Sequence, residues 1–288
     1  MMRKLVILLV ITTCTACAGS SPDRQAVREA TAPDGERIAY EVHGAGDTAL
    51  VFIHGWMCNR NHWRHQLEAF QDKYTVAALD LAGHGQSSRS RKNWTLASLA
   101  KDVVTVVNAL EVRRIVLIGH SMGGPVAVMA ADELPGRVAG IIAVDAMKRP
   151  GAVRSPAARA QMMQSFTQDF AAFTARFVRA HYFHPASDPA LAEEVAKEMA
   201  AGDQAIALAL VTALEELDAV KILKMADGVP LGFINSDAPG TDKAEIMRLR
   251  PTARIVEMPN VRHFPMLEDP NAFNQVLQTF LADWRLMP

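Results

Sequence analysis

The sequence has few cysteines and lacks any long apolar segment. Its three cysteines, at positions 14, 17 and 58, are too few for a disulfide framework. No apolar run approaches the roughly 20 residues that a bilayer-spanning helix needs. The histidines form no His-Glu-x-x-His pattern, so we expect neither a metal site nor a cofactor. With a formal net charge of −1 and no run of five like charges, the chain gives no reason to expect a nucleic-acid partner.

The N-terminus is laid out like a secretory signal peptide, with a basic start and an apolar run at 5–11 followed by small residues. We expect a signal peptide at 1–18 and a polar linker at 19–25, with the protein exported to the periplasm or cell envelope. Cleavage after Ala18 fits an A-x-A site. The alternative is a lipoprotein signal, in which a lipidated Cys17 would tether the chain to a membrane.

Beyond the linker, buried-strand patterns alternate with helical periodicity, which predicts a parallel sheet covered on both faces. A hairpin is expected around Pro33-Asp34-Gly35. Between 148 and 226 the alternation gives way to helical spacing alone, so we predict a helical cap inserted between two parts of one core, 26–147 and 227–288. The expected strands are 49–53, 75–79, 115–118, 138–144, 230–234 and 254–258, and the core helices 61–70, 96–110, 122–133, 242–249 and 271–284.

One serine, in Gly119-His120-Ser121-Met122-Gly123, lies between a predicted strand and a predicted helix. Glycines two residues before and after a serine permit a sharp turn, and a helix N-terminus favours negative charge nearby. A serine hydroxyl becomes a good nucleophile only when a base takes its proton. His263, in a loop after the last predicted strand, is the candidate base.

An acid is needed to hold the imidazole in the correct tautomer. Two aspartates follow strands at the same sheet edge: Asp237 after 230–234 and Asp145 after 138–144. We favour Asp237, because it agrees better with the chain order Ser…Asp…His that is expected on this architecture; Asp145 is the rival and Asp242 a distant third. The backbone N–H groups of Trp56 and Met122 are candidates for an oxyanion hole, although Trp56 is equally explained as a core aromatic.

These motifs resemble the α/β-hydrolase superfamily. His54-Gly55-Trp56 is similar to its oxyanion turn, the segment Asp80 to Ser87 to its D-x-x-G-H-G-x-S loop, and 119–124 to its nucleophile elbow. The segment 228–237 is similar to the strand that carries its acid, and His263-Phe264-Pro265 to its histidine loop. The resemblance implies an α/β-hydrolase fold and a Ser-His-Asp triad.

The expected activity is that of a cofactor-independent serine hydrolase acting on a small-molecule carboxylic ester. Serine at position 121 argues against relatives that carry aspartate there and cleave epoxides or carbon–halogen bonds. Carbon–carbon bond hydrolysis and a perhydrolase-like reaction remain alternatives, and so does a small-molecule receptor on the same fold.

Overall fold

The computed structural model describes residues 26–287. The predicted signal peptide, Cys17 and the whole predicted linker at 19–25 lie outside the described residues. Within the described chain, no helix is long and apolar enough to cross a membrane.

Eight strands form one sheet in the order β1-β2-β4-β3-β5-β6-β7-β8. The hairpin β1–β2 is antiparallel, β2 pairs antiparallel with β4, and every other pairing is parallel. The prediction of a mostly parallel sheet is therefore confirmed. The strands are β1 Arg28–Thr31, β2 Arg37–His43, β3 Thr48–Ile53, β4 Thr75–Leu79, β5 Arg114–His120, β6 Val138–Val144, β7 Leu231–Ser236 and β8 Arg254–Met258.

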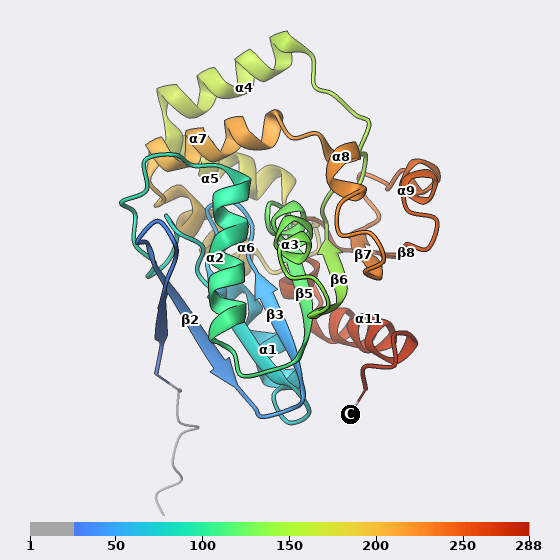
Figure 1. Ribbon diagram of the computed structural model, residues 1–288. Coiled ribbons are helices and arrows are strands. Elements are labelled where there is room, and N and C mark those ends of the chain that lie inside the picture. The colour runs from blue at the N-terminus through green and yellow to red at the C-terminus, as the bar shows by residue number, and fades with distance from the viewer. Residues whose placement is uncertain (1–25, 288) are drawn as a thin grey trace, which may run out of the picture.

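Helices cover both faces of the sheet (Figure 1). Helices α2 (Leu96–Ala109) and α3 (Gly123–Asp132) pack on one face, and α1 (Arg64–Phe70) and α11 (Pro270–Asp283) pack on the other. A 3-10 turn, η1 (Arg60–Trp63), precedes α1, so the predicted helix at 61–70 begins in a tighter turn. Helix α9 (Lys243–Leu249) joins β7 to β8, and α10 (Pro265–Glu268) follows the loop after β8.

Five helices lie between β6 and β7, over the end of the sheet where the parallel strands finish (Figure 1). Each begins at a polar cap, which explains why this stretch breaks into short helices. The side chains of Asp169, Asp188, Asp203 and Asp218 each accept a backbone N–H at the start of a helix, as Ser155 does for the first. The helices are α4 Pro156–Gln168, α5 Phe170–His181, α6 Pro189–Ala200, α7 Gln204–Glu215 and α8 Ala219–Leu223.

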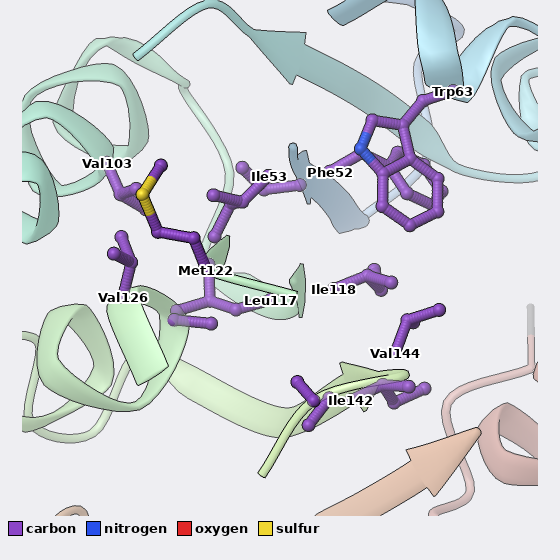
Figure 2. Close-up of a cluster of buried hydrophobic side chains, with 14 of the residues drawn as sticks. Phe52, Ile53, Trp63, Val103, Leu117, Ile118, Met122, Val126, Ile142 and Val144 are labelled. Atoms are coloured by element: carbon purple, nitrogen blue, oxygen red, sulfur yellow. The ribbon is translucent and has the colours of Figure 1, made fainter. Parts of the chain in front are cut away.

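The main core fills both sides of the central strands. Figure 2 shows Val103 of α2 and Val126 of α3 on one side of these strands and Trp63 on the other. Phe52 of β3 is fully buried, and its ring centroid lies 5.0 Å from that of Trp63. Phe273 of α11 contacts the same indole at 6.1 Å. These contacts hold α1 and α11 against the sheet and thereby fix the strand ends that carry the polar side chains described below.

Truncating Phe273 to alanine is expected to lower the free energy of unfolding by about 3–5 kcal/mol, because it removes a fully buried ring and leaves a cavity beside Trp63. Urea unfolding measures this loss. Val153→Ala is the control, since Val153 is 92% exposed and should change stability by less than about 0.5 kcal/mol. Equal effects of the two substitutions would contradict this description of the core.

Candidate active site

Ser121 lies in the turn between β5 and α3 with its backbone in the left-handed region, at φ 52°. The turn leaves no room for side chains at the flanking glycines. A Cβ on Gly119 would lie 2.0 Å from the carbonyl oxygen of Gly123, and a Cβ on Gly123 would lie 2.6 Å from that of Ile53. The Ser121 N–H donates to the carbonyl of Val144 in β6 at 2.9 Å. The turn is thus locked between two neighbouring strands, with a half-buried hydroxyl at its apex.

His263 reaches Ser121 from the loop after β8. Its Nε2 lies 3.0 Å from the Ser121 Oγ. Three further contacts fix the position of His263. Its backbone N–H donates to the carbonyl of Tyr182 at 3.0 Å, and its backbone carbonyl accepts from His120 Nε2 at 2.7 Å. Its ring centroid lies 4.2 Å from that of Tyr182. The structure therefore brings together the serine and histidine that the sequence singled out.

The carboxylate beside this histidine is that of Asp145, and not that of Asp237, which the sequence favoured. The Nδ1 of His263 lies 2.8 Å from Asp145 Oδ2. Asp237 is exposed, and its backbone N–H bonds to the carbonyl of Met258 in β8. The residue before it, Ser236, is what β7 contributes to the site, because its N–H and Oγ both donate to Asp145 Oδ1 at 2.9 and 2.8 Å. Asp242, the third candidate, caps α9.

The carboxyl group of Asp145 is held in its charged form. Burial by itself would raise its pKa, but the hydrogen bond and charge of His263, the ammonium of Lys148 and the Ser236 N–H outweigh burial and bring the pKa below its usual range. Burial lowers the pKa of His120 well below its usual value, so this ring is neutral and donates from Nε2. The backbone of Asp145 is left-handed, with φ 42°, in keeping with a residue held by its surroundings.

The segments that carry the two predicted oxyanion donors lie beside Ser121. Gly55, which precedes Trp56, is so close that a Cβ there would lie 3.2 Å from the Cβ of Ser121. Met122 is the first residue of the turn into α3. Among residues 26–287, neither the Trp56 N–H nor the Met122 N–H has a backbone acceptor outside regular secondary structure. The Trp56 indole has a separate partner, since its Nε1 donates to the carbonyl of Ala207 in α7 at 3.0 Å.

Neutral histidines hold the turn that carries Trp56. His54 Nδ1 donates to the carbonyl of Gly55 at 2.7 Å, so its Nε2 accepts the N–H of Leu81 at 3.0 Å. The ring of His84, from the loop after β4, lies 4.9 Å from that of His54, and its Nδ1 donates to the carbonyl of Ala82. Burial lowers the pKa of each ring to about 3. Both imidazoles act here as neutral hydrogen-bonding spacers.

Three residues of the site escaped the sequence analysis: Lys148, Ser236 and Tyr182. The only sequence signal for two of these residues was their position: Lys148 stands three residues after the candidate Asp145, and Ser236 stands one residue before the candidate Asp237. Nothing in the sequence pointed to Tyr182, which lies at the end of helix α5. Within the described chain, no three His, Cys, Asp or Glu side chains gather in a way that would hold a metal ion.

A cleft of about 1180 Å³ opens elsewhere, at the opposite edge of the sheet. Its lining includes Asp47, Thr75, Arg114 and Gly136, which lie at or near the beginnings of β3 to β6. The Ser121 turn lies where those strands end. The size of a hollow is therefore no guide to this site, which is defined by the hydrogen bonds around Ser121.

Comparisons with known proteins agree with the family that the sequence motifs resemble and with the observed fold. The sequence pattern of the alpha/beta hydrolase family matches residues 50–276. The chain is 38% identical over 122 residues to the dihydrolipoyllysine-residue acetyltransferase component of the acetoin cleaving system of Cupriavidus necator, an alignment that covers 42% of the chain and 33% of that relative. It is 26% identical over 250 residues to 3-oxoadipate enol-lactonase 2 of Acinetobacter baylyi, covering 85% of the chain and 92% of the lactonase.

Among solved structures, an esterase from Thermogutta terrifontis superposes with a TM-score of 0.78 at 24% identity, over 90% of the chain and 99% of the esterase. At that identity the likeness shows the fold. The family match spans most of the sequence, and the matched residues include most of strand β3, strands β4 to β8 and the Ser121 turn. The protein therefore belongs to the alpha/beta hydrolase family.

Acidification is expected to destabilise the protein in part through His84. An unfolded histidine binds a proton below about pH 6.5, whereas folded His84 stays neutral down to about pH 3. Its contribution is thus fully present above pH 6.5 and is lost as the pH falls, by about 1.4 kcal/mol per pH unit. Urea unfolding at several values between pH 7 and 5 measures this slope.

In His84→Asn, whose amide can still donate to Ala82, this slope should be smaller by up to about 1.4 kcal/mol per pH unit. His181→Asn is the control, because His181 is exposed on the cap helix α5 and should leave the slope unchanged. An unaltered slope in His84→Asn would show that the His84 ring is protonated in the folded protein.

Proposed function

We propose that this protein is a serine hydrolase that cleaves carboxylic esters through an acyl-enzyme. The observation that carries the proposal is the continuous hydrogen-bonded chain from Ser121 Oγ through the imidazole of His263 to Asp145. A hydroxyl, an imidazole and a buried carboxylate in this order allow a serine to lose its proton as it attacks a carbonyl carbon.

In the first half of the reaction, Ser121 Oγ bonds to the ester carbonyl carbon while its proton passes to His263 Nε2. The carbonyl oxygen gains the negative charge and is stabilised by the N–H groups of Trp56 and Met122 and by the N-terminus of α3. The carbon–oxygen bond to the alcohol then breaks, and His263 returns the proton to the departing alkoxide. Asp145 keeps Nδ1 protonated and balances the charge on the imidazolium.

In the second half, water attacks the Ser121 ester and gives its proton to His263. Collapse of this tetrahedral intermediate releases the carboxylic acid, and the proton returns to Ser121. Both halves of the reaction use the same oxyanion donors and the same histidine, and water is the second reactant beside the ester. The Ser236 contacts to Asp145 support the scheme, because they occupy Oδ1 and leave Oδ2 directed at the imidazole.

The comparisons support an ester substrate. Among the relatives, 3-oxoadipate enol-lactonase 2 is named for a lactone, which is a cyclic ester, and its alignment covers most of both chains. The fold is also shared with an esterase. We therefore include lactones with open-chain esters in the proposed substrate class.

Helices α4 to α8 are proposed to act as the cap over Ser121, with an apolar acyl group beneath them. Their aromatic side chains support this role. Phe166 and Phe170 pack edge-on against the Trp56 indole at 5.3 and 6.1 Å, and the Tyr182 ring lies against His263. The cap thus contacts both the oxyanion turn and the base, and its aromatic surface suits apolar acyl chains better than charged ones.

Ser121→Ala is expected to reduce ester hydrolysis about 10⁴- to 10⁶-fold without unfolding the protein, because it removes the nucleophile and leaves the turn intact. A panel of esters and lactones, scored for kcat/KM, measures the loss. A fluorophosphonate should label wild type at Ser121 and leave Ser121→Ala unlabelled. Labelling at another serine would overturn the mechanism, and stoichiometric binding without turnover would favour a small-molecule receptor.

Asp145→Asn is expected to lower kcat about 10³- to 10⁴-fold, because an amide favours the wrong imidazole tautomer at His263. Asp237→Asn is the matched control, since Asp237 is exposed and has no contact with the imidazole, and it should retain nearly normal turnover. Thermal unfolding of both variants separates catalytic from structural loss. If only Asp237→Asn lost activity, the residue that orients the imidazole would be Asp237 and not Asp145.

A further inference from the structure

Lys148 delivers its charge to the carboxylate beside the imidazole. Its side chain is only 10% exposed, and its Nζ lies 3.0 Å from Asp145 Oδ1. The same ammonium donates to the carbonyl and the Oγ of Ser236 at 2.8 and 2.9 Å. All three protons of the ammonium therefore have acceptors, one on Asp145 and two on Ser236, which itself bonds to Asp145.

The backbone is arranged so that both side chains reach this point. Asp145 and Met147 are both left-handed, with φ 42° and 49°, in the segment that leaves β6. The carbonyl of Lys148 accepts the N–H of Asp242 at 2.8 Å, which ties the segment to the start of α9. Two left-handed non-glycine residues within three positions are costly, and such strain persists where the surrounding structure fixes it, often at functional sites.

A lysine at this position opposes the usual role of the acid. Asp145 favours the imidazolium that forms when His263 takes the Ser121 proton, and a positive charge on the far side of the same carboxylate reduces that preference. The consequence is an imidazole that remains unprotonated, and hence able to act as a base, at lower pH. The Ser236 contacts keep the carboxylate in place while its charge is shared.

We propose that Lys148 is a positioning residue that, through Asp145, extends the working range of His263 toward acidic pH. The proposal rests on the hydrolase function proposed above. It assigns Lys148 an effect on the pH profile of catalysis, which an ion pair serving stability alone would not have.

The other groups around His263 do not supply this charge. His120, at the end of β5, has its ring 4.7 Å from that of His263 and is neutral because burial lowers its pKa. Tyr182, at the end of α5, is also neutral, since burial raises its pKa. Glu268 of α10 accepts the N–H groups of Arg262 and Phe264 on either side of the histidine. Lys148 is therefore the cation to test.

Lys148→Met is expected to move the acid limb of the kcat/KM profile upward by about 0.5 to 1 pH unit. The Asp145 carboxylate separates the Lys148 ammonium from the imidazole, and a shift of about 0.5 to 1 pH unit corresponds to a roughly 3- to 10-fold change in the ionisation equilibrium. Below the limb, activity should fall by the same 3- to 10-fold, with a much smaller change on the plateau. Arg149→Met removes the same charge from an exposed neighbour that bonds only Gly240, and should leave the limb in place.

Lys148→Gln provides a second variant should the methionine fail to fold, because its amide can still donate to Ser236. Lys148→Arg keeps the charge and should keep the limb close to wild type. A folded Lys148→Met or Lys148→Gln with an unmoved acid limb would overturn the proposal, as would an equal shift in Arg149→Met.

Titration of the His263 ring by NMR separates this proposal from the hydrolase function. The resonance is assigned through His263→Gln, and its midpoint should rise by the same 0.5 to 1 pH unit in Lys148→Met. Should no ester or lactone be hydrolysed, the function proposed above fails while this midpoint still tests the effect of Lys148. An unmoved midpoint together with normal ester hydrolysis would overturn only the role of Lys148.

Discussion

The backbone of β5 and the first turn of α3 approach so closely at Ser121 that only glycine fits two residues before it and two residues after it. Gly119 and Gly123 leave no space for a methyl group, and the Ser121 N–H is bonded across to β6. This contact forces the serine into a left-handed conformation and raises its hydroxyl above the ends of the strands. The rest of the site is arranged around a hydroxyl that cannot move far, because the segments that hold it are themselves buried in the core.

Three chain segments converge on that hydroxyl. The turn after β5 supplies Ser121, the segment that leaves β6 supplies Asp145, and the loop after β8 supplies His263. Strand β7 lies between β6 and β8 in the sheet and contributes Ser236. Parallel strands end at one edge of the sheet, so side chains separated by more than a hundred residues meet there without strain in the sheet itself. Lys148, Ser236 and His263 all bond to the Asp145 carboxylate, and its charge is thereby stabilised in a buried place.

The helical insertion is connected to the chemistry of this edge at two points. The Trp56 indole bonds to α7, while the Trp56 backbone lies beside Ser121. At the end of α5, the carbonyl and ring of Tyr182 hold His263. A displacement of these helices would therefore move both the turn that carries Trp56 and the imidazole of His263. Helices α5 and α7 thus contact both the loop that carries His263 and the turn that carries Trp56.

The sequence by itself determined the strands, the helices, the serine turn and the late histidine, because each is encoded by local patterns. The strand predicted at 49–53 is β3, Thr48–Ile53, and the glycine at 119 reflects a close approach to Gly123 within the same turn. The acid was decided only by tertiary structure. Asp145 and Asp237 both follow strands at one edge, and which carboxylate meets the imidazole depends on the path of the loop after β8. The contacts of Lys148 with Ser236 and of Tyr182 with His263 have the same origin, because these pairs are distant in sequence and only packing brings them together.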